Sequence, residues 1–130
     1  MIGSKLLIDA CVVIKVMNSN QIFLKKITAA GDSTISTTVL GELFTGVYRA
    51  INKEKQMKKL NDFLTTCAIL NVDSKTSEHF GEVYAALLNK GKPIPINDVW
   101  IAASAKQHGL TLITKDKHFA EIEGLDVEFW

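Results

Sequence analysis

The sequence has few of the residues that define fibrous, disordered or disulfide-rich chains. Two prolines and eight glycines in 130 residues exclude a collagen-like chain and a low-complexity linker. Two cysteines cannot form a disulfide framework, which fits a reducing compartment. The hydrophobic fraction is 47% and the charged fraction 22%, enough apolar material for one continuous core. We therefore expect a single globular domain over residues 1–130.

Long hydrophobic runs and an excess of charge of one sign are also missing. The apolar stretch of residues 6–17 is too short to span a bilayer and is interrupted by Asp9 and Lys15. Residues 1–5 do not have the pattern of a signal peptide. Fifteen basic and fourteen acidic side chains leave a net charge of +1, so no strong field indicates a membrane or nucleic-acid partner. These absences predict a cytoplasmic protein without a membrane anchor.

Short apolar runs alternate with helical patterns along the chain. The predicted strands lie at residues 5–8, 34–36, 68–72, 110–114 and 127–130. The helical patterns lie around residues 12–17, 21–30, 40–51, 60–64, 80–88 and 99–107. We expect Thr37 or Thr38 to cap the third helix and Asn97 or Asp98 to cap the last. This alternation predicts an α/β fold with a mostly parallel central sheet and helices on both faces.

Four acidic residues lie where an open parallel sheet binds its ligands. Asp9 directly follows the first strand, and Asp116 lies two residues beyond the strand that ends near Thr114. Asp98 opens a helix, and Glu42 lies in the first turns of another. In right-handed crossovers the strand ends and the starts of the following helices face one edge of the sheet. We therefore expect the four carboxylates to converge there.

Converging carboxylates call for a cation, because like charges a few ångströms apart cannot all stay ionised. Mg²⁺ and Mn²⁺ are hard ions that take oxygen ligands and keep several waters. Such an ion polarises a phosphoryl oxygen, generates hydroxide and stabilises the leaving oxygen. The pattern therefore favours hydrolysis of a phosphodiester.

Three of these acids also have an ordinary structural interpretation. Asp98 is a common helix-capping residue type, and Asp116 lies between two lysines in a predicted turn. Glu42 lies near a helix start, where the helix dipole favours a solvated acid. Asp9 differs from them, because it interrupts an apolar run without a local reason.

The segments around these acids resemble the motifs of the PIN-domain nucleases, in particular the VapC-type toxins of bacterial and archaeal toxin–antitoxin pairs. They are residues 7–14, 36–46, 91–103 and 111–125, in the order of the family and over nearly the whole chain. The third is the most specific of the set, with Gly91-Lys92-Pro93-Ile94 followed by Asn97-Asp98-Val99-Trp100-Ile101-Ala102-Ala103.

The resemblance implies a three-layer α/β/α PIN domain that binds Mg²⁺ or Mn²⁺ and cleaves RNA, such as tRNA, by attack of activated water. It implies that the metal-binding and catalytic residues are Asp9, Glu42, Asp98 and Asp116. Thr114 is then expected as a hydroxyl beside the metal or the attacking water, or else as an ordinary strand-end residue. The first motif of the family usually has a hydroxyl residue where this chain has Ala10, which removes one hydrogen bond that can orient the metal.

Positive charge outside the acids is expected to hold the RNA. With the four site acids neutralised by metal, ten carboxylates remain against fifteen basic side chains, so the rest of the surface carries about +5. The lysines that flank the expected pocket are candidates for phosphate contacts: Lys15, Lys92, Lys115 and Lys117. The basic run from Arg49 to Lys59 is more simply a solvated helix face.

Other polar and aromatic residues have weaker patterns. Three histidines and two cysteines lack the paired spacing of a zinc site, and only His118 is expected near the acids. Cys11 is interpreted as an inert thiol in the core or on the pocket floor. Asn97 is interpreted as a helix cap, with a contact to Asp98 or to the substrate as the alternative. The helical spacing of Trp100 favours packing.

Apolar side chains on the middle helices exceed what one small core buries, and such a surplus indicates a partner. They are Tyr48, Ile51, Met57, Phe63 and Leu64. The resemblance implies two partners, a second copy of the chain in a homodimer and a cognate antitoxin. The antitoxin would lay a helix into a groove between these helices and block the acidic pocket with its tail.

Three other functions fit parts of the sequence. A housekeeping PIN nuclease of RNA processing or decay has the same motifs and differs in causing no growth arrest on expression. A non-catalytic receiver domain has a similar length, but it needs an acidic pair after the first strand, where Asp9 stands alone. An RNA-binding module that has lost catalysis would bind RNA without metal.

Overall fold

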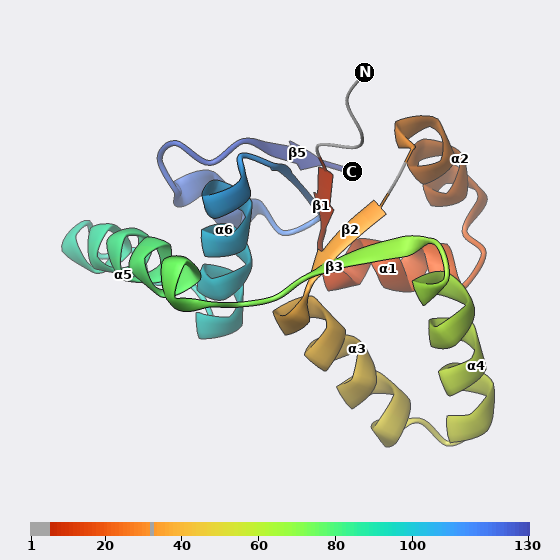
Figure 1. The fold of residues 1–130 in the computed structure, drawn as a ribbon. Helices are drawn as coiled ribbons and strands as arrows, with labels where there is room; N and C mark the ends of the chain where they lie inside the picture. Colours follow the sequence, from red (N-terminus) through yellow and green to blue (C-terminus); the bar gives the residue numbers. More distant parts are fainter. Residues whose placement is uncertain (1–5, 32) are drawn as a thin grey trace.

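A central sheet lies between two layers of helices in the computed structural model, which describes residues 6–31 and 33–130 (Figure 1). The strands are β1 (Leu6–Ile8), β2 (Ser33–Ser36), β3 (Cys67–Leu70), β4 (Thr111–Thr114) and β5 (Val127–Phe129). The helices are α1 (Ala10–Met17), α2 (Gln21–Ala30), α3 (Thr37–Arg49), α4 (Lys53–Leu64), α5 (Ser74–Asn89), α6 (Ile96–His108) and the 3₁₀ helix η1 (Lys117–Glu121). Lys5, the first residue of the first predicted strand, lies outside the described residues.

The sheet has the strand order β3-β2-β1-β4-β5, and every neighbouring pair is parallel. Parallel neighbours need crossover connections, and the helices between the strands supply them. The middle strands β1 and β4 are covered on both faces, since Leu7, Ile8, Leu112 and Ile113 are completely buried. The predicted α/β fold is therefore confirmed, and its sheet is parallel throughout.

The two helical layers lie on opposite sides of the central strand β1 (Figure 1). In Figure 1, α5 and α6 lie on the left of β1, and α1, α2 and α4 lie on its right. Helix α6 is buried from Asp98 to Ala105 except at Trp100, and its small residues let its backbone approach the sheet closely. Trp100 stacks on Phe80 of α5 with ring centres 4.2 Å apart, which confirms its predicted packing role.

The predicted cap of α3 is wrong by one residue. The side chain of Ser36 accepts a hydrogen bond from the backbone N–H of Val39 (3.2 Å), and neither Thr37 nor Thr38 caps the helix. The reason is that β2 runs directly into α3, so the last strand residue takes the capping position. Glu42 consequently lies in the second turn of α3.

The start of α6 also differs from the prediction. The helix begins at Ile96, three residues before the predicted position, after Pro95 has taken an extended conformation (φ −53°, ψ 142°). No side chain caps this helix, so the interpretation of Asn97 as a cap is wrong. Asp98 is not a cap either, and both side chains are left for other contacts.

The surplus of apolar surface is smaller than predicted. Met57, Phe63 and Leu64 pack against the core, whereas the side chains of Tyr48 and Ile51 stay exposed. Within residues 6–31 and 33–130, every helix is too short or too polar to cross a bilayer.

Candidate active site

Asp9 lies at the carboxyl end of β1 and is 4% exposed. Its backbone N–H donates to the carbonyl of Ile113 (2.9 Å), which extends the pairing of β1 with β4 by one residue. Its side chain accepts one hydrogen bond from the backbone N–H of Ala10 (2.8 Å) and another from the hydroxyl of Thr114 (2.6 Å). Both carboxylate oxygens are therefore fixed by the sheet edge and by the start of α1.

Thr114 is completely buried at the end of β4 and connects two of the acids. Its Oγ1 donates to Asp9 Oδ2 and accepts from the backbone N–H of Asp116 (3.1 Å). The Cys11 thiol lies 3.6 Å from Asp9 Oδ2 and 3.9 Å from Thr114 Oγ1, so it lies beside both side chains. The hydroxyl thus contacts Asp9 and the backbone of Asp116, and its role beside a metal ion or an attacking water stays a prediction.

Asp116 is exposed just beyond β4 and joins two groups of side chains. One ligand atom from each of Asp9, Cys11 and Asp116 lies within 4.8 Å of the others. The same holds for Asp98, Asp116 and His118. Asp116 belongs to both groups, so three of the four predicted acids meet at one place.

His118 forms the contact that the sequence did not reveal. Its Nε2 lies 2.7 Å from Asp98 Oδ2, and the Asp98 side chain is only 12% exposed. Burial raises the pKa of Asp98, the charge of Asp9 adds to the rise, and the contact with His118 opposes it. The available signal was the position of His118 two residues after Asp116.

Glu42 completes the acidic group from the second turn of α3. Burial raises its pKa from 4.5 to about 7, and the charges of Asp9 and Asp98 add to that rise, followed by the charge of Asp116. The Asn97 side chain works against the rise, so this residue acts on Glu42 rather than as a helix cap. Glu42 is therefore close enough to the other three acids for their charges to repel its own.

The donor set fits a divalent cation. Oε1 of Glu42 is buried and, among the described residues, has no hydrogen-bond partner. A buried carboxylate oxygen without a partner is costly, and a bound cation removes that cost. The group offers mainly carboxylate oxygens, which are the ligands that hard divalent cations take.

We predict that the metal-free protein loses stability as the pH rises from about 5 to 8. The folded-state pKa of Glu42, about 7, lies above its ordinary value of 4.5. Between these values the folded state binds more protons than the unfolded state, so the free energy of unfolding falls as pH rises. Urea unfolding in EDTA across this range measures the fall.

Two variants separate the contribution of Glu42 from the rest. Glu42→Gln should make the decline shallower, because the amide does not ionise. Glu54→Gln, on the exposed surface of α4, is the matched control and should leave the decline as it is. An equally steep decline in Glu42→Gln and the wild type contradicts this prediction.

The four lysines predicted to contact phosphates lie in different surroundings. Lys115 and Lys117 are exposed on either side of the acid that follows β4. Lys92 forms an ion pair with Glu121 (3.6 Å), so part of its charge is already balanced. Lys15 is exposed in the last turn of α1.

A groove begins at the acidic group and follows the helices on its side of the sheet. It has a volume of about 200 Å³ and lies between α1, α3 and the start of α4. Its lining includes Glu42 at one end and Ile14, Met17, Leu43, Gly46 and Val47. The groove is therefore mainly apolar, and Glu42 is the member of the acidic group that lines it.

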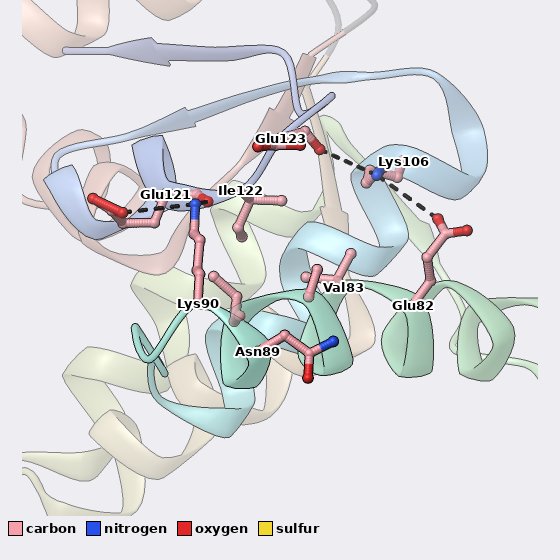
Figure 2. Close-up of a pocket in the computed structure, with 10 residues that line it drawn as sticks. Glu82, Val83, Asn89, Lys90, Lys106, Glu121, Ile122 and Glu123 are labelled. Atoms are coloured by element: carbon pink, nitrogen blue, oxygen red, sulfur yellow. Dashed lines mark hydrogen bonds and ion pairs between the residues drawn. The ribbon is translucent and has the colours of Figure 1, made fainter.

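A pocket of about 510 Å³ between α5, α6 and η1 is separate from the acids (Figure 2). Lys90 donates to the carbonyl of Glu121, and Lys106 donates to the carbonyl of Glu123 (3.3 Å) and pairs with Glu82 (3.9 Å). Because these lysines have partners within the pocket wall, the pocket shows no chemistry comparable to that of the acidic group.

Comparisons with known proteins agree with this geometry. Residues 6–125 match the family model described as PIN domain. The chain is 33% identical over 102 residues to Ribonuclease VapC2 of Haemophilus influenzae, covering 78% of this chain and 77% of that protein. It is 30% identical over 97 residues to the tRNA(fMet)-specific endonuclease VapC of Salmonella typhimurium, covering 74% of each.

The fold matches as well. The crystal structure of VapBC2 from Rickettsia felis, bound to a DNA fragment from their promoter, superposes with a TM-score of 0.91 at 28% identity. The match covers 96% of this chain and 98% of the other. It thus extends over nearly the whole chain.

Proposed function

This chain belongs to the PIN-domain family, and from that membership we propose that it is a metal-dependent endoribonuclease and the toxin of a toxin–antitoxin pair. The observation that carries the proposal is the meeting of four carboxylates at the carboxyl edge of the parallel sheet. They are Asp9, Glu42, Asp98 and Asp116. No simpler structural role accounts for four acids whose charges repel one another.

The four acids would hold Mg²⁺ or Mn²⁺. The ion, when bound, polarises the scissile phosphate and lowers the pKa of water. Asp9 provides a ligand whose direction is already fixed by two hydrogen bonds. In the metal-free protein, burial and the charges of Asp9 and Asp98 raise the pKa of Glu42 to about 7, and a bound cation would offset these charges and favour the ionised side chain as a ligand. His118 keeps Asp98 in place through their 2.7 Å contact.

The proposal is tested with purified protein and RNA in buffers that contain Mg²⁺, Mn²⁺ or EDTA. Because the Salmonella relative is named for tRNA(fMet), initiator tRNA is the first substrate, with total tRNA and rRNA beside it. We expect discrete fragments with metal and none with EDTA. Intact RNA under every condition, from protein that is folded by circular dichroism, contradicts the nuclease assignment.

Growth separates a toxin from a housekeeping nuclease with the same fold. We expect expression of this chain to arrest growth and co-expression of the small gene directly upstream to relieve the arrest. Normal growth during strong expression of an active nuclease favours the housekeeping role.

We predict that Thr114→Val lowers the affinity for the metal ion by about 10- to 100-fold, the usual effect of losing a group that orients a ligand. Valine has nearly the shape of threonine but cannot donate to Asp9 Oδ2. Isothermal titration with Mn²⁺ measures the affinity. Thr114→Ser keeps the hydroxyl and should stay near the wild type, and equal losses in both variants contradict the prediction.

The antitoxin is expected to occupy the groove that starts at Glu42. An amphipathic helix buries its apolar side in such a groove. Its tail then reaches the acids, where an arginine or lysine pairs with the carboxylates and displaces the metal. A homodimer remains part of the proposal, and light scattering of the purified chain measures it.

A further inference from the structure

Three lysines and three aromatic rings lie in two neighbouring groups at the end of β5 and beyond β4, which we together call the cationic–aromatic tract: Phe23, Lys26, Lys115 and Trp130 contact one another, and Lys117 lies over Phe129. The ammonium group of Lys26 lies 5.5 Å from the centre of the Trp130 ring, and that of Lys115 lies 5.9 Å from the centre of the Phe23 ring. The rings of Phe23 and Trp130 meet edge to face at 6.4 Å.

The tract begins at the acidic group itself. The backbone N–H of Trp130 donates to the carbonyl of Thr114 (3.0 Å), and the hydroxyl of Thr114 donates to Asp9. Lys115 and Lys117 come directly before and after Asp116, and Lys117 lies 4.3 Å from the centre of the Phe129 ring. A strand of RNA with its scissile phosphate at the acids would therefore pass over the tract.

The lysines of the tract form no ion pair with another described residue. Within the described part of the chain, Lys26, Lys115 and Lys117 have no carboxylate oxygen within 4.0 Å. Five other lysines do have such a partner: Lys58, Lys75, Lys90, Lys92 and Lys106. Lys15, Lys25, Lys53, Lys55 and Lys59 also lack such a partner among the described residues, but Lys26, Lys115 and Lys117 differ from them in lying over aromatic rings. The tract lysines are therefore available for an anion from outside the chain.

The aromatic rings are held firmly enough to act as a platform. Phe23 and Trp130 pack in part against the core and are half-buried, so their remaining surface faces solvent. The indole N–H of Trp130 donates to Glu128 Oε2 (3.2 Å), which fixes the ring further. A ring held in this way loses little freedom when a base stacks on it.

We propose that the tract binds a single-stranded segment of the RNA substrate next to the cleaved bond, with the lysines on phosphates and a base stacked on Trp130. This rests on the proposed nuclease function. A basic surface interleaved with aromatic rings is the usual platform for single-stranded nucleic acid. Bases in a duplex are stacked on each other and cannot reach such a ring, so the tract selects unpaired RNA.

The test uses the fluorescence of Trp130 as the reporter. The protein carries Trp100→Phe, which leaves Trp130 as its only tryptophan, and Asp98→Asn, which is expected to prevent cleavage. A short unstructured oligoribonucleotide is titrated in, and a blunt RNA duplex of the same length serves as comparison. We expect saturable quenching by the single strand and little quenching by the duplex.

The affinities of the protein variants for labelled RNA then show which residues of the tract contact the RNA. Trp130→Ala should weaken binding by about tenfold, and Trp130→Phe should recover part of that loss. Lys26→Ala and Lys117→Ala should each reduce the slope of log affinity against log salt by about 0.7. Lys55→Ala, an exposed lysine on α4, is the matched control and should leave both the affinity and the slope unchanged.

The outcomes separate this inference from the nuclease proposal. The wild type could cleave RNA with metal while Trp130 shows no quenching and the tract variants bind RNA with unchanged affinity. This result would reject the proposed role of the tract and keep the nuclease proposal. Equal quenching by the duplex or by an acidic peptide also overturns the role of the tract, in favour of a general anion-binding surface. A wild type that neither binds nor cleaves RNA overturns both. Trp130→Phe keeps the test decisive if Trp130→Ala does not fold.

Discussion

Asp98→Asn is expected to lower the rate of RNA cleavage by at least about a thousandfold while the protein stays folded. The amide keeps the shape of the side chain and can still accept a hydrogen bond from His118. It removes the negative charge that holds a cation, and metal-assisted stabilisation of the transition state amounts to several kcal/mol. Burial and the charge of Asp9 raise the pKa of Asp98, so loss of its charge relieves repulsion and does not destabilise the fold.

Single-turnover cleavage of tRNA measures the rate, and thermal unfolding followed by circular dichroism checks the fold. Asp62→Asn is the matched control, because Asp62 is exposed on α4 and pairs only with Lys58 (3.1 Å). We expect this control to cleave at the wild-type rate. A rate for Asp98→Asn within tenfold of the wild type removes Asp98 from the mechanism.

Gly46→Phe is expected to separate inhibition from cleavage. Gly46 lines the groove between α1 and α3, and no atom beyond its chain neighbours and the adjacent backbone of α3 lies within 4 Å of the position that a β-carbon would take. The β-carbon of a phenylalanine there meets open space, the substitution improves the helix propensity of α3, and the ring is expected to fill the space that a partner helix needs. We expect affinity for the cognate antitoxin to fall at least about 100-fold, about the effect of losing one central contact of an interface.

Gly81→Phe provides the control for this variant. Gly81 lies on α5 in the other helical layer, is exposed, and also has open space at its β-carbon position. We expect both variants to cleave RNA at the wild-type rate and only Gly46→Phe to resist the antitoxin. Binding by surface plasmon resonance gives the affinities. Full inhibition of Gly46→Phe contradicts the placement of the antitoxin in this groove.

Elements with strong local signals could be predicted closely from the sequence. The predicted helix at 21–30 matches α2, because Asn20 caps it through its side chain and Gly31 ends it with φ 93°. The predicted start of α6 was wrong, because the helix begins directly after the extended residue Pro95 and has no capping side chain that could mark its start in the sequence. The end of a helix can therefore be predicted from the sequence more closely when a capping side chain or a glycine terminates the helix.

The acidic group could be predicted in outline, because strand ends in a parallel sheet share one edge. The individual contacts within the group depend on how distant elements pack, and no periodic sequence pattern reports that packing. The contact of His118 with Asp98 requires the 3₁₀ turn of η1 to bring residue 118 back over the start of α6. The meeting of Phe23 with Trp130 joins α2 to the end of β5, and it depends on where a helix lies across a sheet. Neither contact follows from spacing along the chain.

The register between β1 and β4 determines where the chain can accept inserted residues. Ile8 is paired with Ile113, so Asp9 and Thr114 lie next to each other at the carboxyl edge of the sheet. One residue inserted into either strand would turn the following side chains to the opposite face and separate this pair. The turn between α3 and α4, at Ile51, is exposed and far along the helices from that edge. Natural insertions and engineered tags should be tolerated at this turn and excluded from the two central strands.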